Sequence, residues 1–235
     1  MDTGKGGRKL VIVSGASRGI GFALAERLSN TYDVVGFARQ EPKEPCNFQF
    51  VSGVDVTDKT AVKEFARKID TANLWGVVAC AGIASMNHFL SMPDATRDKI
   101  VDVNFHGVAN VVEVLGKGLI KNKGGRIIVL STIAVPLLLE GEAVYAASKS
   151  AAETYVKIIA NELGEWGVTA NLIRPGPTDT DLLAGLTDEQ VDAIISKQTL
   201  KRKTTFDDLE GICRFFLSDE AALLTGQTLT LGLSG

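Results

Sequence analysis

The sequence predicts an α/β protein built on a single Rossmann-type, doubly wound parallel β-sheet with helices on both faces. Two observations and one general rule of chain topology support this fold class. Apolar runs of strand length alternate along the chain with segments of helical periodicity. The strand-length runs are rich in Val and Ile, which indicates burial on both faces of a sheet. Right-handed crossovers between such strands give the doubly wound arrangement.

The chain has 235 residues, of which 45 % are hydrophobic, enough for one sizeable core. No linker, repeat or low-complexity segment interrupts the alternation. We therefore expect one domain that spans residues 1–235.

The first half of the chain is expected to hold four strands. Leu10–Val13 is the first, and the helix that follows covers Phe22–Leu28 with its apolar residues facing inward. The other three strands are expected at 34–37, 48–51 and 75–80. A second helix passes through Val62, Phe65 and Ile69, before the last of these strands.

The second half is expected to begin with a long helix over roughly 97–120. Strands at 126–130 and 169–173 then flank a helix over 145–163, and a helix at 209–217 precedes a last short strand at 228–231. The polar, amphipathic segment 181–205 lies outside the alternation. We expect it to fold over a site as a lid.

A glycine-rich turn joins the first strand to the first helix. The glycines Gly15, Gly19 and Gly21 follow the spacing G-x-x-x-G-x-G. Glycines at this junction let the backbone turn tightly and approach a pyrophosphate, which the free N–H groups and positive dipole end of the helix would bind. An ordinary strand–helix turn is the alternative, but the position after the first strand of an α/β chain favours nucleotide binding.

The residues after the second strand bear on the choice of cofactor. Folds that bind NAD place an acid there for the ribose 2′-hydroxyl. This chain instead has Ala38-Arg39, and Arg18 lies in the glycine turn. Because arginine pairs well with phosphate, we expect NADP (as NADPH) rather than NAD, although Arg39 could also be a solvated surface charge.

Tyr145 and Lys149 are spaced i, i+4, so they share one face of a helix. An ammonium about 4 Å away would contribute roughly 4 kcal/mol at an effective dielectric of 20. This interaction would lower the pKa of the phenol by up to about 3, before any desolvation is counted. The tyrosine could then transfer a proton to or from a substrate oxygen. The pair follows the fifth strand, where ligands of such sheets bind.

Taken together, the motifs resemble the short-chain dehydrogenase/reductase family from Leu10 to Gly235. They occur in the family's order: the glycine turn, Asp55-Val56, Cys80-Ala81-Gly82, Asn104 in Val-Asn-Phe-His-Gly, Ser131-Thr132, Tyr145 with Lys149, and the run 174–180, Arg-Pro-Gly-Pro-Thr-Asp-Thr.

The resemblance implies roles for individual residues. Tyr145 would donate the proton in carbonyl reduction, Lys149 would hold the nicotinamide ribose and lower the pKa of Tyr145, and Asn104 would fix a water that relays protons to Lys149. Asp55 and Val56 would flank the adenine, and Thr180 with the backbone near Thr178 would meet the nicotinamide and phosphate end. The implied catalytic set is Asn104, Thr132, Tyr145 and Lys149. The implied cofactor-binding set is Gly15, Ser17, Arg18, Gly19, Ile20, Gly21, Arg39, Asp55, Val56, Ala81, Gly82, Asn104, Tyr145, Lys149, Pro175, Gly176, Thr178 and Thr180.

Two departures from the family's pattern stand out. Ala79-Cys80-Ala81-Gly82 replaces the usual Asn-Asn-Ala-Gly, which removes a stabilising asparagine. The serine that assists the tyrosine lies 13 residues before it in close relatives, and that position is Thr132 here. Threonine makes the same hydrogen bonds with a stiffer side chain. Ser131 is the neighbouring alternative, and we expect it to point to the opposite face.

Composition limits the partners. The net charge is −3 without a basic cluster, which argues against nucleic acid. The longest apolar stretch, 127–139, is too short to span a bilayer, so no membrane partner is expected. Two histidines and three scattered cysteines fit no metal-ligand pattern. No signal-peptide pattern is visible, and we expect a cytoplasmic location.

Within the family, the chain most resembles bacterial 3-oxoacyl-carrier-protein reductases. We expect NADPH-dependent reduction of a small-molecule ketone to a secondary alcohol, with acyl thioesters as one candidate substrate class and cyclic or sugar ketones as another. Arg126 matches a basic position associated with carrier-protein docking, whereas a second such position is Trp166. By resemblance, we also expect a homotetramer or homodimer.

Two other functions share parts of this pattern. A non-catalytic NADP-binding regulatory protein is one, and the intact Asn104, Tyr145 and Lys149 argue against it. A sugar-nucleotide epimerase or dehydratase is the other, but such enzymes usually carry a larger substrate domain.

Overall fold

A seven-stranded parallel sheet forms the centre of the molecule. The computed structural model describes residues 7–234. The strands lie in the order β3-β2-β1-β4-β5-β6-β7, and every neighbouring pair is parallel. This arrangement confirms the predicted doubly wound Rossmann-type fold. The strands are β1 (Leu10–Ser14), β2 (Asp33–Phe37), β3 (Gln49–Val51), β4 (Leu74–Ala79), β5 (Gly125–Leu130), β6 (Val168–Arg174) and β7 (Thr228–Thr230).

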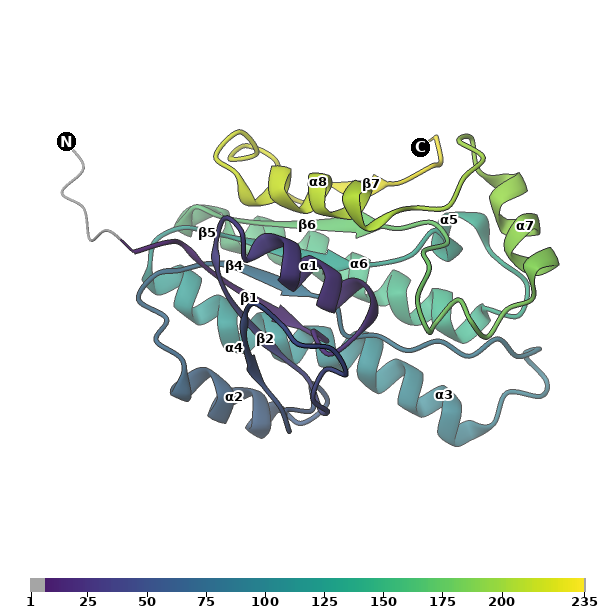
Figure 1. Ribbon diagram of the computed structural model, residues 1–235, viewed down its shortest axis with the longest axis horizontal. Helices are drawn as coiled ribbons and strands as arrows, with labels where there is room; N and C mark the ends of the chain where they lie inside the picture. The colour runs from purple at the N-terminus through teal and green to yellow at the C-terminus, as the bar shows by residue number, and fades with distance from the viewer. Residues whose placement is uncertain (1–6, 235) are drawn as a thin grey trace.

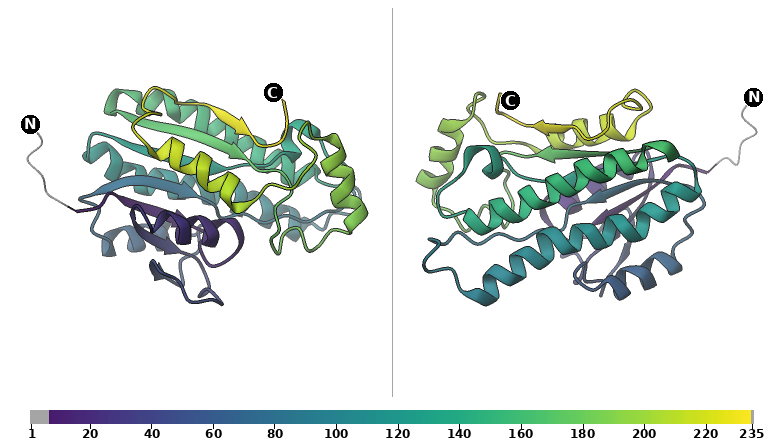
Figure 2. Two further views of the ribbon diagram at one scale, coloured as in Figure 1. Left: turned by 45° about the horizontal axis from the view of Figure 1, so that its top comes forward. Right: turned by 180° about the vertical axis from the view of Figure 1, so that it is seen from behind.

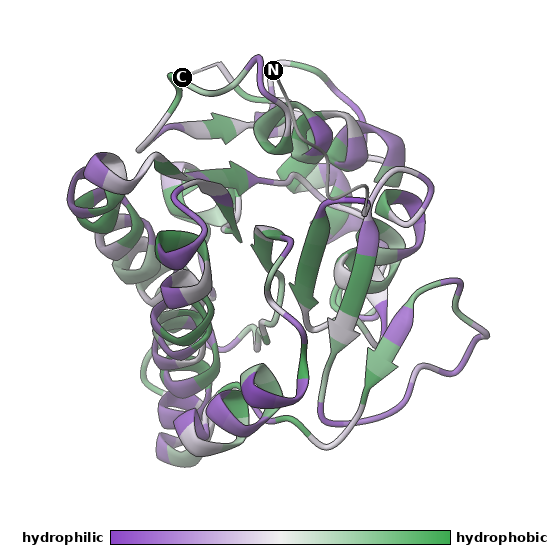
Figure 3. Cartoon of the chain, turned by 90° about the vertical axis from the view of Figure 1, so that its left-hand side faces the viewer, coloured by the Kyte–Doolittle hydropathy of each residue, from purple (hydrophilic) through white to green (hydrophobic). Residues whose placement is uncertain are grey.

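The inner strands are buried along almost their whole length because helices cover both faces of the sheet. All five residues of β1 and all six of β5 are buried. Figure 3 shows these strands in the colour of apolar residues, while the helices around them carry polar residues on their outer surfaces. The unbroken Val and Ile runs of the sequence therefore correspond to burial on two sides.

Two helix layers enclose the sheet (Figures 1 and 2). One face is covered by α1 (Gly19–Leu28) and α8 (Phe206–Leu217), whose apolar residues share one core cluster. The opposite face is covered by α2 (Lys59–Lys68), α4 (Gly107–Lys121) and α6 (Ala143–Leu163), which form the second cluster. Each expected strand and core helix is present, with ends that differ by a few residues.

The long helix expected over 97–120 is interrupted. It consists of α3 (Asp94–Val101), a π-helical turn η1 (Asp102–His106) and α4. Asn104 lies within this turn and is fully buried. A π turn accommodates one extra residue in a helix and often marks a functional position. Residue periodicity alone gave no sign of it.

All seven strands point the same way, so their carboxyl ends meet at one edge of the sheet. The short α5 (Ala134–Leu137) follows β5 at this edge. At the opposite edge, η2 (Gly164–Trp166) joins α6 to the start of β6. The segment 181–205, expected as a lid, contains α7 (Asp188–Lys197), which stands beyond the carboxyl ends of the strands (Figure 1). Within residues 7–234, no helix has the length and apolarity needed to cross a membrane.

Candidate active site

The glycine turn forms a backbone cradle at the carboxyl end of β1. Gly15 and Gly19 have positive φ angles of 69° and 56°, which favour glycine. A Cβ at Gly21 would lie 2.3 Å from the carbonyl oxygen of Gly15, so any side chain would disrupt the turn. No side chain caps the N-terminus of α1, and its first N–H groups are left to bind an anion. The cradle therefore fits a nucleotide pyrophosphate. Ser17 and Ile20 belong to this turn.

Two other loops of the sheet edge lie against the glycine turn. A Cβ at Gly15 would come within 2.8 Å of the backbone of Ala81, which follows β4. A Cβ at Gly19 would lie 3.4 Å from the methyl group of Thr180, which follows β6. The glycine turn thus lies against both Ala81 and Thr180.

The next group along this edge of the sheet consists of two buried side chains, those of Asn104 and Lys149, and the exposed Gly82. A Cβ on Gly82 would lie 3.1 Å from Lys149 Nζ and 3.3 Å from Asn104 Oδ1, so both side chains converge on this glycine. Lys149 Nζ donates a hydrogen bond to the carbonyl oxygen of Leu130 at 2.8 Å. Burial lowers the pKa of the Lys149 ammonium to about 8.

Asn104 is held entirely by protein atoms. Its Oδ1 accepts from the Ile83 N–H at 2.9 Å, and its Nδ2 donates to the Ile83 carbonyl at 2.9 Å and to Ser148 Oγ at 3.0 Å. Ser148 in turn donates to the Tyr145 carbonyl at 2.7 Å. Ser148 and Ile83 were not predicted as site residues. Ser148 lies between Tyr145 and Lys149, outside the i, i+4 pair on which the prediction was based, and Ile83 takes part only through its backbone.

Tyr145 lies at the start of α6 and is 8 % exposed. Burial raises the pKa of its phenol to about 12, a hydrogen bond with Thr132 lowers it, and the charge of Glu142 raises it. The expected lowering of this pKa by Lys149 is therefore absent in the free protein. The reason is physical: desolvation of the phenol dominates, and the ammonium is bonded to a backbone carbonyl.

The two neighbouring hydroxyls after β5 have different partners. Thr132 hydrogen-bonds with Tyr145, and its Oγ1 also accepts from the Ala134 N–H at 3.1 Å. Ser131 instead donates to the carboxylate of Glu153, one turn beyond Lys149 in α6. Thr132 is thus the hydroxyl that faces the tyrosine.

Glu153 also anchors the end of β6. Its carboxylate accepts a bidentate pair of hydrogen bonds from Arg174, with Nε at 2.6 Å. Glu153 and Arg174 are both largely buried, so the pair ties β5, β6 and α6 together directly behind the tyrosine–lysine face. Residue spacing does not indicate this contact, because its members are far apart along the chain.

The arginines expected to select the cofactor are exposed. Arg39 follows β2, is 52 % exposed and has its Nη1 3.8 Å from Asp55 Oδ2. Arg18, the residue before α1, pairs with Asp181 at 3.3 Å, with both side chains about 70 % exposed. Exposed pairs of this kind are weak and exchange readily for another anion.

The remaining predicted residues lie at the same edge. Asp55 accepts hydrogen bonds from the N–H and hydroxyl of Thr57. The side chain of Val56 is buried against Gly107 of α4, so only its backbone could meet a ligand. After β6, residues 175–178 are buried: Pro175 accepts from the Ile133 N–H at 3.0 Å, Gly176 donates to Thr204 Oγ1, and Thr178 donates to the Gly176 carbonyl.

Arg126, expected as a docking cation, is not available at the surface. It is only 4 % exposed and its guanidinium stacks over the ring of Trp75 at 4.5 Å. Its nitrogens donate to the carbonyl oxygens of Gly125 and Ser218. The side chain instead joins β5 to the end of α8.

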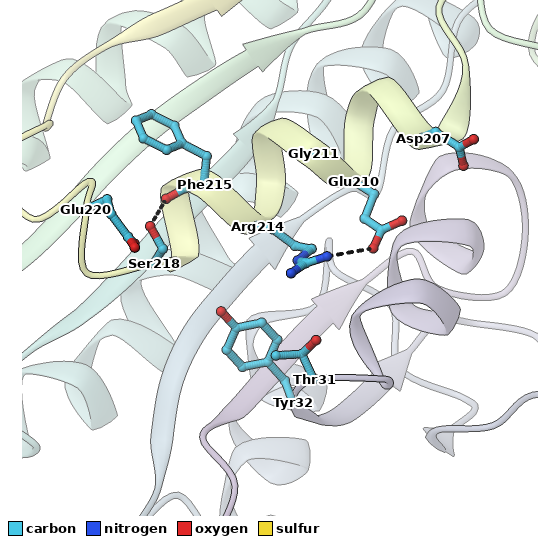
Figure 4. A pocket seen from close by; sticks show the side chains of 9 residues that line it. All are labelled: Thr31, Tyr32, Asp207, Glu210, Gly211, Arg214, Phe215, Ser218 and Glu220. Atoms are coloured by element: carbon cyan, nitrogen blue, oxygen red, sulfur yellow. Dashed lines mark hydrogen bonds and ion pairs between the residues drawn. The ribbon is translucent and has the colours of Figure 1, made fainter.

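A surface hollow of about 520 Å³ lies away from the candidate site residues (Figure 4). It is formed between the end of α1 and α8, and the ion pair of Arg214 with Glu210 spans 3.7 Å along its wall. Thr31 and Tyr32, which line it, precede β2 and therefore mark the amino-terminal edge of the sheet. None of the predicted site residues lines this hollow.

Comparisons with known proteins agree with this geometry. A family described as enoyl-(acyl carrier protein) reductase matches residues 15–232. The chain is 30 % identical to the 3-oxoacyl-[acyl-carrier-protein] reductase of Escherichia coli over 230 residues, 94 % of either chain. The corresponding protein of Vibrio cholerae is also 30 % identical, over 231 residues, with the same coverage of both chains. Among solved structures, the aldohexose dehydrogenase of Thermoplasma acidophilum superposes with a TM-score of 0.86 and 26 % identity, covering 96 % of this chain and 94 % of that one.

Proposed function

The chain is an oxidoreductase of the short-chain dehydrogenase/reductase family, and we propose that it reduces a ketone to a secondary alcohol with NADPH. The observation that carries this proposal is the buried arrangement of Tyr145 with Thr132, beside Lys149 and Asn104. These groups adjoin a glycine cradle that fits a pyrophosphate, so a dinucleotide bound there would reach the tyrosine.

Tyr145 is the proposed proton donor to the carbonyl oxygen of the substrate. With its pKa raised to about 12, the phenol is protonated at neutral pH and ready to donate. Thr132, already bonded to the phenol, would bind the same oxygen and help to orient it. When bound, NADPH would supply the hydride to the carbonyl carbon.

The cofactor would be held by the glycine turn, by the backbone of Ala81 and Gly82, by Lys149, and by the loop 175–180. Lys149 Nζ converges on Gly82 and is positioned to bind ribose hydroxyls. Arg39 and Arg18 would exchange their exposed carboxylate partners for the 2′-phosphate of NADPH. The preference for NADPH over NADH rests on these two arginines.

Two substrate classes are supported. The curated relatives named above act on 3-oxoacyl-[acyl-carrier-protein], which supports a 3-oxoacyl thioester. The structural relative is an aldohexose dehydrogenase, which supports a hydroxylated substrate. Burial of Arg126 removes one cation expected to dock a carrier protein.

A cofactor-oxidation assay tests the proposal. NADPH consumption is followed with 3-oxoacyl thioesters, cyclic ketones and sugar ketones, and Tyr145→Phe serves as the control. We expect turnover of at least one ketone by the wild-type protein and near-complete loss in the variant. Binding of NADPH without turnover of any ketone by the wild-type protein would instead support a regulatory nucleotide-binding role.

We further propose that the protein is a homotetramer or homodimer. The helices α4 and α6 lie side by side on one face (Figure 2), and Ile158 of α6 is 54 % exposed there. An apolar side chain on such a helix pair suits a closed, symmetric interface. Light scattering at micromolar concentration should give two or four times the mass of the chain, and a monomer would contradict the proposal.

A further inference from the structure

Glu142 carries a buried carboxyl group that makes no hydrogen bond or ion pair within residues 7–234. It precedes α6 directly, three residues before Tyr145, and is 8 % exposed. Its Oε2 is enclosed and has no hydrogen-bond partner among residues 7–234. Glu142 occupies the capping position of α6, but its side chain makes no capping hydrogen bond. Buried polar atoms are almost always paired, so an orphaned carboxyl oxygen needs an explanation.

The surroundings of Glu142 place it beside the loop that follows β4. The carbonyl of its neighbour Gly141 accepts from the Asn87 N–H at 2.9 Å, and a Cβ on Gly141 would lie 2.8 Å from Met86 Cγ. Met86 Sδ accepts in turn from Gln190 of α7 at 3.5 Å. Glu142 therefore lies where the α5–α6 connection meets the loop after β4, with α7 in contact with that loop. The negative charge of Glu142 acts on the phenol of Tyr145.

The electrostatics agree with an uncompensated carboxyl group. No ion pair involving Glu142 occurs in the described part of the chain, and burial raises the pKa of its carboxyl to about 7. In the protonated or the ionised form, at least one of its oxygens can accept a hydrogen bond. A ligand that donates to it would satisfy a group that the protein leaves unpaired.

We propose that Glu142 determines substrate specificity by accepting a hydrogen bond from a hydroxyl group adjacent to the reacting carbonyl, so that the protein favours hydroxyketones over apolar ketones. This inference rests on the proposed function and specifies its substrate class. An apolar group at the same place would leave Oε2 unpaired, and an anionic group would be repelled. Sites built to bind a substrate hydroxyl discriminate against the analogue that lacks it.

The test compares two ketones that differ by one group. In 3-hydroxy-2-butanone a hydroxyl lies next to the carbonyl, and in 3-methyl-2-butanone a methyl replaces it. We expect the wild-type protein to favour the hydroxyketone about ten- to a hundredfold in kcat/KM with NADPH. Glu142→Leu should bring this ratio to about one, because the acceptor is gone. Glu142→Gln should keep most of it, because the amide oxygen still accepts.

Two controls separate specificity from damage to the fold. Glu140→Leu removes an exposed carboxylate from the same connection and should keep the wild-type ratio. A far-UV circular dichroism spectrum and a Kd for NADPH that both equal those of the wild-type protein would show that Glu142→Leu keeps its fold and its cofactor site. A wild-type ratio near one, or an unchanged ratio in Glu142→Leu, would overturn the inference.

A binding measurement distinguishes failure of the inference from failure of the proposed function. If the wild-type protein turns over neither ketone, the proposed reaction is wrong. The shift in melting temperature that each ketone causes then tests the assignment of Glu142 separately. A larger shift with the hydroxyketone in the wild-type protein and in Glu140→Leu, lost in Glu142→Leu, would support the assignment of Glu142. Equal shifts in all three proteins, or none, would overturn it.

Discussion

Two parts of the same sheet edge are constructed in opposite ways. Behind the tyrosine, Glu153 and Arg174 form a largely buried, bidentate ion pair, and Asn104 is fully bonded to the protein. Around the glycine turn, Arg18 and Arg39 are exposed and held only by single contacts to carboxylates. The first region is fixed by folding itself, whereas the second can rearrange when an anion arrives. The groups near the proposed proton donor are thus preorganised, whereas the arginines proposed to select the cofactor are exposed and weakly held.

Removal of the Tyr145 hydroxyl should have the largest effect of all. Tyr145→Phe should lower kcat by about 10²–10⁴-fold, because the proton donor is lost while the ring still packs. The Kd of NADPH should change little, since the buried region keeps its shape. Steady-state kinetics and a fluorescence titration measure the two quantities. A variant with wild-type turnover would place the chemistry elsewhere.

Breaking the buried ion pair of Glu153 with Arg174 should have the second-largest effect, on the free energy of unfolding. Glu153→Ala leaves Arg174 without its partner in a largely buried position, and should lower the free energy of unfolding by about 3–5 kcal/mol. The matched control is Asp181→Asn, which breaks the exposed pair with Arg18 and should cost no more than about 0.5 kcal/mol. Urea denaturation compares the two variants. Similar losses in both would erase the distinction between the regions.

Arg39→Ala tests the exchangeable region. Loss of a charge-assisted hydrogen bond of about 1.5–3 kcal/mol should weaken NADPH binding by roughly ten- to a hundredfold. NADH binding should barely change, because NADH lacks the 2′-phosphate. Titration of both cofactors gives the answer, and equal weakening would mean that Arg39 has only a structural role.

Glu142→Gln should change how the free energy of unfolding depends on pH. The carboxyl has a pKa of about 7 in the folded protein and about 4.5 when unfolded, so the folded state holds its proton longer. Stability is therefore lost as pH rises from 4.5 to 7, and the full penalty is present above pH 7. The variant should be more stable than wild type by about 1–3 kcal/mol at pH 8, with a much smaller difference at pH 5. Thermal melts at both pH values test this, and a pH-independent difference would contradict it.

Much of the fold follows from local sequence. The apolar runs around Ile12 and Ile128 are unambiguous because both faces of those strands are buried. The glycine turn is equally clear, since Gly21 has no room for a side chain. The observed ends of the helices and strands differ from the predicted ends by a few residues. The π turn at Asn104 was not predicted, because it depends on how the helix packs rather than on its periodicity.

The site was predicted less completely, for reasons of tertiary environment. The sequence left two hydroxyls open, and only the structure separates Thr132, beside the tyrosine, from Ser131, bonded to Glu153. It suggested a surface role for Arg126, which is buried over Trp75. It also gave no indication that Glu142 is buried without a partner. Burial and pairing of charged residues are properties of the packed chain, and residue spacing does not report them.

The π turn at Asp102–His106 also limits how this protein can change over evolutionary time. Because the turn accommodates one extra residue, deleting one residue from it would restore regular α geometry and change which side chains the turn directs toward the loop after β4. Asn104 would then lose its hydrogen bonds with the backbone of Ile83. Single-residue deletions in this stretch should therefore be eliminated by selection, whereas exposed loops such as the one around Lys43 should tolerate changes in length.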